Sequence, residues 1–379
     1  MLSFFASAWA DFAALIMSLA MMFGTTFGLF VPATTTAPED YLDSNIKNVI
    51  YLIGDGMGFN HLEKAKNERN IELTMDSFDY QGESMTRSFS NAVTDSAAGG
   101  TALATGVRTL NGAIGVYPMD VTGTFTHPKS LTELCLESGK MTGVITTDET
   151  SGATPSAFSA HSSSRDNTED ITEDQLTSDI DLIWGAQNGV ATKEDAEANG
   201  FTYVTTSAEM LALKEGSRSF AQFTNDLWTL APSDINTPNL EMMTKKAIDI
   251  LDDTEEGFFL MVEGAHIDKH SHSNEDAKMT EALQEFDETI EYVLEYAKAD
   301  GETLVIITAD HETGAIVANS DGTYSFTSGS HSAANVPVLV YGSEVLIQNG
   351  EVLNNYEIPI RIAYILGFTE EEFPFEVAA

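Results

Sequence analysis

The sequence predicts an α/β fold in which a mostly parallel central β-sheet is flanked by helices on both faces. Five short runs are rich in Val, Ile or Leu, and near-continuous apolar strands are typical of sheets buried on both faces. The runs are NVIYLIGDG, MTGVITT, GFFLMVEG, TLVIITAD and VPVLVYG, which begin at residues 48, 141, 257, 303 and 336. Between the third and fourth runs, residues 279–297 place apolar side chains at helical spacing, with acids on the other face.

The composition sets the size of the core and argues against one class of partner. The chain has 379 residues, 42% of them hydrophobic, which is enough for one large domain or two ordinary ones. Its 59 acidic residues outnumber its 18 lysines and arginines, and the formal net charge is −41. We expect no binding to a nucleic-acid duplex, because such binding needs clustered cations. A cation inside a motif is therefore expected to meet an anion.

The single cysteine, Cys135, lies with Leu131 and Leu134 at the spacing of an apolar helix face. We interpret Cys135 as a buried core thiol. One cysteine cannot form a disulfide within the chain, so the cysteine count says nothing about export.

The N-terminal segment predicts export. Residues 12–37 carry no charge, and FAALIMSLAMMFGTTFGLFV is about long enough to cross a bilayer. The basic start of a secretion signal is missing, but VPATTTA ends in small residues that suit cleavage near Ala37. We expect residues 1–38 to be an export signal or a retained anchor that contacts a membrane through residues 12–32. The protein is then periplasmic, extracellular or anchored on the outer face; the alternative is a buried core helix.

The acidic segment SRDNTEDITEDQLTSDID, residues 164–181, is interpreted as a solvated loop. Calcium binding is the alternative, but the segment lacks the glycine and the terminal glutamate of an EF-hand loop.

Metal-type side chains follow three of the predicted strands. Asp55 follows the first run, Glu263 lies at the end of the third, and Asp310 and His311 follow the fourth. Ligands of open α/β sheets lie at the carboxyl ends of the strands. One such carboxylate is ordinarily a cap or turn residue, but three strand ends together predict a metal site at this edge.

A second set of metal-type residues surrounds the motif VEGAHIDKHSH. Asp268 and His272 are four residues apart and share a face if a helix runs through them. A carboxylate and an imidazole suit a zinc ion with mixed oxygen and nitrogen ligands. His331 lies in GSHSAANVPV, just ahead of the last strand, whereas His266 and His270 are spare and at least one is interpreted as a surface histidine.

Ser96 opens a run of small residues, NAVTDSAAGGTALATG, that favours a helix. A hydroxyl at a helix N-terminus faces unpaired N–H groups and the positive end of the helix dipole, which favour a bound anion and an alkoxide. Contact with a zinc ion would lower the pKa of the Ser96 hydroxyl and make it nucleophilic. The alternative is that Ser96 is merely a helix N-cap.

Six motifs together resemble the alkaline phosphatases, in that family's order and over roughly residues 48–341. They are LIGDGMG, TDSAAGGTALATGVRTLNGAIGV, TSGATPSAFSAHSSSR, MVEGAHIDKHSH, TADHETG and GSHSAANVPV. The resemblance implies a homodimeric enzyme with two zinc ions and one magnesium ion per subunit. Its catalytic domain would be residues 39–379. The reaction would be hydrolysis of small phosphate monoesters at alkaline pH through a phosphoserine, releasing inorganic phosphate and an alcohol.

The resemblance also implies a role for each matching residue. The first zinc ion would be held by Asp268, His272 and His331. The second, which contacts the nucleophile Ser96, would be held by Asp55, Asp310 and His311. Magnesium would be held by Asp55, Thr154 and Glu263. Arg165 would bind the phosphate, and Asp95 would orient Arg165. Lys269 would approach the phosphate through water.

Two departures from the family pattern qualify the resemblance. His311 and His331 are only twenty positions apart, so the crown insertion of longer members is small or absent and a compact bacterial-type member is expected. Gly152 stands where relatives often have Asp or His near magnesium. A third metal site that is weaker and exchanges faster follows, unless a neighbouring acid, Asp148 or Glu149, does the same work.

Other functions share parts of this pattern. A metallo-phosphodiesterase, a sulfatase or a phosphomutase would have the same metal core, and an acidic surface protein would bind metal without catalysis. The joint presence of Thr154 and Glu263 favours the monoesterase over a diesterase, and the modified-residue motif of sulfatases is missing. Ser96 and Arg165 together argue against an inactive protein. The sequence does not identify the alcohol of the physiological substrate, because this class of enzyme binds mainly the phosphate group and leaves the alcohol outside the site.

Overall fold

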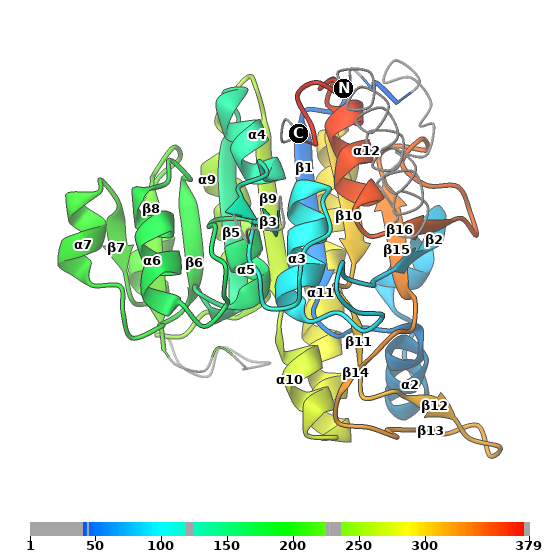
Figure 1. Cartoon of the computed structure of the whole chain (residues 1–379). Helices are drawn as coiled ribbons and strands as arrows, with labels where there is room; N and C mark the ends of the chain where they lie inside the picture. Colours follow the sequence, from blue (N-terminus) through cyan, green and yellow to red (C-terminus); the bar gives the residue numbers. More distant parts are fainter. Residues whose placement is uncertain (1–40, 44, 119–124, 225–226, 228–235, 375–379) are drawn as a thin grey trace, which may run out of the picture. The chain divides into compact units, whose positions relative to one another are not determined.

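A ten-stranded, mostly parallel sheet forms the centre of the computed structural model (Figure 1). The structure describes residues 41–43, 45–118, 125–224, 227 and 236–374. In order across the sheet, the strands are β16 (Val352–Asn354), β2 (Tyr80–Met85), β15 (Val336–Tyr341), β10 (Thr303–Thr308), β1 (Asn48–Gly54), β9 (Phe258–Gly264), β5 (Met141–Glu149), β6 (Leu182–Ala186), β8 (Ser219–Phe223) and β7 (Thr202–Val204). Among these described strands, β15 alone runs antiparallel to its neighbours. The predicted fold class is confirmed.

Helices cover both faces of this sheet, as predicted. The helices of one face are α9 (Leu240–Leu251) and α11 (Asp276–Asp300), and those of the other are α3 (Ser96–Thr105), α4 (Leu131–Glu137), α5 (Ala153–Ala157) and α12 (Glu357–Ile365). The long α11 confirms the helix predicted over residues 279–297. Cys135 is buried in α4, which confirms its interpretation as a core thiol.

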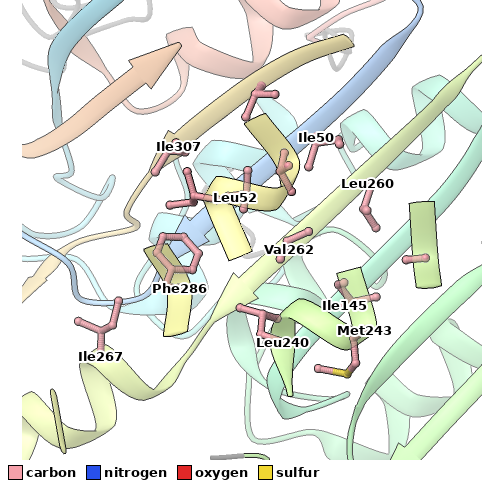
Figure 2. Close-up of a cluster of buried hydrophobic side chains, with 14 of the residues drawn as sticks. Ile50, Leu52, Ile145, Leu240, Met243, Leu260, Val262, Ile267, Phe286 and Ile307 are labelled. Atoms are coloured by element: carbon pink, nitrogen blue, oxygen red, sulfur yellow. The ribbon is translucent and has the colours of Figure 1, made fainter. Parts of the chain in front are cut away.

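The alternation of side chains along β1 explains why the sheet is buried on both faces. Ile50 and Leu52 point into the core cluster under α9 and α11, where Figure 2 shows them with Phe286. Tyr51 and Ile53 point to the opposite face and join the cluster under α3, α4 and α12. Successive strand residues face opposite sides, so a strand covered twice must be apolar at nearly every position.

The remaining elements are short and lie outside the central sheet. The helices among them are α2 (Phe59–Arg69), the 3₁₀ helix η2 (Thr74–Ser77), α6 (Thr168–Thr177), α7 (Lys193–Ala198), α8 (Ser207–Leu211) and α10 (His266–His272). Three two-stranded pairs complete the list: β3 (Tyr117–Pro118) with β4 (Phe125–Thr126), β11 (Glu312–Thr313) with β14 (His331–Ser332), and β12 (Val317–Ala318) with β13 (Tyr324–Ser325).

The acidic segment 164–181 is not the solvated loop that we predicted. Its centre forms α6, in which Ile171, Gln175 and Leu176 are buried. Ile171 and Gln175 are four positions apart, as are Thr172 and Leu176, so the buried residues lie along one side of the helix. The side-chain amide of Gln175 donates to the carbonyl oxygen of Thr150 at 2.7 Å and to Ser159 Oγ at 2.9 Å. Buried contacts on one face therefore order a segment whose other face is acidic.

The predicted export segment, residues 1–38, lies outside the described residues. Within the part that is described, no helix is both long enough and apolar enough to span a bilayer.

Candidate active site

The carboxyl ends of β10, β1 and β9 carry three acidic side chains of the site. β1 pairs in parallel with both neighbours, and Ile53 is opposite Thr308 on one side and Glu263 on the other. Asp55 and Asp310 follow these strands by one and two residues. The structure thus brings together the three strand ends, as the sequence predicted.

Asp55, Asp310 and His311 form what we call the buried group. One ligand atom of each lies within 4.8 Å of the others, and all three residues are buried. Asp310 Oδ1 accepts hydrogen bonds from the backbone N–H groups of Gly56, at 3.2 Å, and His311, at 2.9 Å.

Two carboxylate oxygens of the buried group lack a hydrogen-bond donor. Asp55 Oδ1 and Asp310 Oδ2 are inaccessible to solvent and receive no hydrogen bond from any described residue. Both face His311 Nε2, which is 3.6 Å from Asp55 Oδ1 and 3.2 Å from Asp310 Oδ2. Burial and then the nearby charge of Asp310 raise the pKa of Asp55 well above its usual range. Buried charges are paired or coordinate metals, so these residues fit a cation bound between them.

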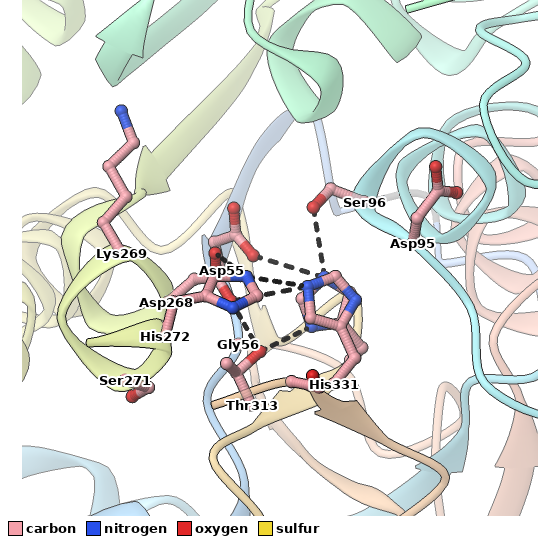
Figure 3. Close-up of polar contacts among 12 residues, drawn as sticks. Asp55, Gly56, Asp95, Ser96, Asp268, Lys269, Ser271, His272, Thr313 and His331 are labelled. Atoms are coloured by element: carbon pink, nitrogen blue, oxygen red, sulfur yellow. Dashed lines mark hydrogen bonds and ion pairs between the residues drawn. The ribbon is translucent and has the colours of Figure 1, made fainter. Parts of the chain in front are cut away.

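Asp268, His272 and His331 form what we call the open group, and they also satisfy the distances of a metal site. Asp268 and His272 lie one turn apart on α10, as predicted, and His331 reaches them from β14 (Figure 3). His272 Nε2 is 3.3 Å from Asp268 Oδ2 and 3.1 Å from His331 Nε2. The side chain of His272 is 41% exposed, whereas Asp268 is buried and His331 is partly buried, so this group reaches solvent through His272.

The open group is balanced by its own charges. The hydrogen bond with Asp268 raises the pKa of His272 to about 9. Burial alone would raise the pKa of Asp268, but the hydrogen bond from His272 and the nearby imidazoles hold it below its usual range. An aspartate and imidazoles are the mixed oxygen and nitrogen ligands that zinc accepts.

Ser96 is the first residue of α3, and the helix brings its hydroxyl to the buried group. The N-cap is Asp95, whose Oδ1 accepts from the N–H of Ala98 at 3.0 Å, so the N-cap interpretation of Ser96 is wrong. Ser96 Oγ lies 3.1 Å from His311 Nε2. A Cβ at Gly99 would stand 2.8 Å from the carbonyl oxygen of Asp310. The small residues therefore allow the helix to approach the metal-type ligands.

Two positively charged side chains, those of Arg165 and Lys269, lie near this site. Arg165 Nη1 is 3.6 Å from Asp95 Oδ2, and the Arg165 side chain is 39% exposed. Asp95 Oδ2 also accepts from the N–H of Gly112 at 2.8 Å, which fixes the carboxylate that faces the guanidinium. Lys269 lies on α10 and forms a short ion pair with Asp148.

Thr154 and Glu263 are the remaining residues of the predicted magnesium site, and Glu263 is opposite Ile53 of β1 in the sheet. Thr154 Oγ1, at the start of α5, is buried and has no hydrogen-bond partner among the described residues. Burial and then the charge of Asp148 raise the pKa of Glu263 to about 8. Carboxylate and hydroxyl oxygens are ligands that suit magnesium, so the unpartnered hydroxyl fits this hard cation.

Two threonines beside the site were missed from the sequence. The hydroxyl of Thr313 donates to Asp268 Oδ1 and lies 3.2 Å from His311 Nδ1, so it links the open group to the buried group. The hydroxyl of Thr146 donates a short hydrogen bond to Glu263. A single hydroxyl has no periodicity or spacing that would distinguish it, and only the fold shows what these residues contact.

The arrangement joins a nucleophile to groups that attract an anion. The Ser96 hydroxyl has the N–H groups of a helix start behind it, metal-type ligands beside it, and a guanidinium nearby. Such a site can bind a tetrahedral anion and neutralise charge that develops on its oxygens.

Comparisons with known proteins agree on one family. A family-wide sequence description named alkaline phosphatase matches residues 46–186 and 185–341. Alkaline phosphatase 4 of Bacillus subtilis is 35% identical over 300 residues, which cover 74% of this chain and 64% of that protein. The chain thus spans less than two thirds of that relative's length.

Solved structures give the same result. The alkaline phosphatase of the Antarctic bacterium TAB5 is 29% identical, with a TM-score of 0.72 over 86% of this chain and 99% of that one. A mutant of the TAB5 enzyme, 28% identical with a TM-score of 0.71 and the same coverage, has Mg bound in its M3 site.

Proposed function

This chain belongs to the alkaline phosphatase family, and from that premise we propose that it hydrolyses phosphate monoesters at alkaline pH in a metal-dependent reaction. The products are inorganic phosphate and an alcohol, and the intermediate is a phosphoserine on Ser96. The observation that carries the proposal is the placement of the Ser96 hydroxyl, 3.1 Å from His311 Nε2, at the start of a helix of small residues.

The cofactors are two zinc ions and one magnesium ion per subunit. The open group would hold the first zinc ion and the buried group the second, and Asp55, Thr154 and Glu263 would hold magnesium. The unpartnered oxygens of Asp55, Asp310 and Thr154 support this assignment. When bound, the cations neutralise negative charge on the attacking and leaving oxygens of a displacement at phosphorus.

The side chains divide the remaining work. Arg165 binds two phosphate oxygens through the paired N–H donors of its guanidinium, and Asp95 orients it. Ser96 Oγ then gives up its proton to solvent and attacks phosphorus, and the bond from phosphorus to the alcohol oxygen breaks as the serine bond forms. The departing alcohol oxygen takes up a proton from water. Water next attacks the phosphoserine, the serine–phosphorus bond breaks, and inorganic phosphate leaves. Lys269 approaches the phosphate through water.

A comparison of two substrates tests the proposal. Turnover of p-nitrophenyl phosphate should greatly exceed that of bis-p-nitrophenyl phosphate, should stop with a chelator, and should return with zinc and magnesium. A phosphorylated residue trapped at low pH should map to Ser96. Preference for the diester would identify a phosphodiesterase instead, and chelator-resistant turnover would exclude the metal-dependent reaction.

We also propose that the enzyme is exported, contacts a membrane through residues 12–32 if that segment is retained, and acts as a homodimer. The uncharged run of residues 12–37 supports export, and family membership supports the dimer. Cell fractionation and light scattering of the purified enzyme test these points. A chain that starts at Asp40 should be soluble and fully active, and its failure to fold would show that the uncharged run is core.

A further inference from the structure

Gly152 leaves a space beside the proposed magnesium site, and another side chain fills it. The backbone of Gly152 has φ −53° and ψ 153°, a conformation open to any residue. A Cβ at this position would stand 2.6 Å from Asp148 Oδ2 and 2.9 Å from Asp148 Cγ. The carboxylate of Asp148 therefore occupies the volume that a side chain at position 152 would enter.

Asp148 is tied to the site from two directions. Its backbone N–H donates to Thr146 Oγ1 at 2.8 Å, and that hydroxyl donates to Glu263. Its side-chain Oδ1 accepts a short hydrogen bond from Lys269 on α10. Thr146 is directly opposite Glu263 in the pairing of β5 with β9. Asp148 lies two residues after Thr146 on β5, towards the carboxyl end of the strand.

The residues proposed to hold magnesium supply fewer oxygens than the ion takes. Thr154, two residues after Gly152, has a buried hydroxyl with no partner among the residues described. Magnesium takes six oxygens in near-octahedral geometry and keeps several waters. Asp55, Thr154 and Glu263 supply only part of that number, so the remaining waters need a protein group to order them.

We propose that Asp148 is the positioning residue of the magnesium site, where its carboxylate replaces the side chain that Gly152 lacks. Asp148 holds the ammonium of Lys269 and orders the water side of the magnesium shell. Positions 148 and 152 thus form a coupled pair in which one carboxylate is needed and two do not fit. This inference rests on the proposed function.

Magnesium calorimetry on the full, zinc-loaded chain tests the role of Asp148. Asp148→Asn keeps the shape of the side chain and removes its charge, and it should weaken magnesium affinity by about 10–100-fold, the range for groups that orient metal ligands. Glu149→Gln is the matched control, because Glu149 is the adjacent acid on β5 and is exposed; it should leave the affinity unchanged. Equal affinities in the wild type and Asp148→Asn would overturn the proposal.

A swap of the carboxylate between the two positions is the sharper test. Gly152→Asp alone should not tighten magnesium binding, because its side chain meets that of Asp148. Asp148→Ala with Gly152→Asp should recover most of the affinity lost in Asp148→Ala, whereas Asp148→Ala with Gly152→Asn should not. The same effect of Gly152→Asp in both backgrounds would show that the positions are independent and would refute the coupling.

The wild type separates this inference from the proposed function. If the zinc-loaded wild type forms no phosphoserine from p-nitrophenyl phosphate, the proposed function fails, whatever the calorimetry shows. If the wild type forms it and the Asp148 variants still bind magnesium as the wild type does, only the inference fails. Thermal unfolding of each variant shows whether a loss of affinity reflects a loss of folding.

Discussion

The buried group and the open group contain similar ligands, but their charges are balanced in different ways. In the buried group, Asp55 and Asp310 are close together without solvent, and each keeps an oxygen without a hydrogen bond from the described residues. In the open group, Asp268 is paired with His272, whose side chain is 41% exposed. The buried group has two carboxylates beside one imidazole, that of His311, whose pKa is lowered by burial. The open group has one carboxylate beside His272, whose pKa is raised by its hydrogen bond with Asp268.

This difference indicates how the two groups divide the work. A cation in the buried group would relieve a cost of folding, so we expect it to bind tightly and to stabilise the protein. A cation in the open group would displace a proton from His272 and keep a side open to water, as catalytic zinc sites do. We expect the second cation to exchange more readily.

The largest expected effect is that of Ser96→Ala, which separates chemistry from metal binding. Turnover should fall by about 10³–10⁶-fold, because the phosphoenzyme cannot form. Zinc content should be unchanged, since both groups remain intact. Metal analysis and kinetics of the same preparation check this. Zinc loss in Ser96→Ala would mean that the hydroxyl is needed to hold the buried cation.

Asp310→Asn should lower the melting temperature of the metal-bound protein and raise that of the chelated protein, each relative to the wild type in the same state. With metal bound, the variant should lose zinc, turnover and thermal stability, because one ligand of the buried group is gone. After chelation it should melt at a higher temperature than the chelated wild type, since the charge beside Asp55 is removed while Oδ1 can still accept both backbone N–H groups.

His272→Ala is the matched change in the open group. It removes the partner of Asp268, so the chelated variant should melt lower than the chelated wild type near pH 6.5. Differential scanning calorimetry of both variants, with and without chelator, decides the comparison. If chelated Asp310→Asn also melts lower, the buried group carries no electrostatic cost of its own.

Arg165→Ala should mainly affect the anion and spare both groups. Inhibition by inorganic phosphate should weaken by about 10–100-fold, which corresponds to the loss of a charge-assisted pair of hydrogen bonds. Arg165→Lys should recover only part of this loss, because an ammonium cannot make the paired contact. Zinc content is the control. An unchanged inhibition constant for phosphate in Arg165→Ala would exclude the clamp.

The smallest expected effect is a pH dependence of the chelated protein. The folded pKa of Glu263 is raised to about 8 and that of His272 to about 9, from usual values of 4.5 and 6.5. The folded protein therefore binds more protons than the unfolded protein, at Glu263 between about pH 4.5 and 8 and at His272 between about pH 6.5 and 9. The contribution of both groups to stability is lost as pH rises through these ranges. The melting temperature in chelator should drop by a few degrees from pH 5 to pH 9. Glu263→Gln should flatten the lower part of the curve, and a flat wild-type curve would contradict the assignment.

The sheet and most of the candidate ligands were predictable because their patterns are local. Apolar runs identify strands buried on both faces, and a carboxylate at a strand end needs only the parallel pairing to reach its neighbours. The spacing of Asp268 and His272 likewise predicts one face of a helix. These features depend on a period or on the end of an element, both of which can be read from neighbouring residues.

The features that were missed depend on distant contacts. Segment 164–181 has so many acids that the buried face of Ile171, Gln175 and Leu176 is hidden in the composition. For Gly152, the sequence left two neighbouring acids open, Asp148 and Glu149, and the turn after β5 shows that Asp148 lies against it. The hydroxyl of Thr313 gained a role from α10, a helix far from it in the sequence.

The pairing of β1 with β10 also orders events in time. Asn48 and Thr303 are 255 residues apart and hydrogen-bond to each other, and closing so long a loop requires nearly the whole chain. During synthesis, Asp55 emerges early, but the buried group is incomplete until Asp310 and His311 have been added. The open group is complete only after His331. A ligand that binds folded but not unfolded protein stabilises only the chains that have folded. Stabilisation by a bound cation therefore requires that synthesis has passed these residues. A chain released before residue 311 would have neither group complete and would gain no stabilisation from metal.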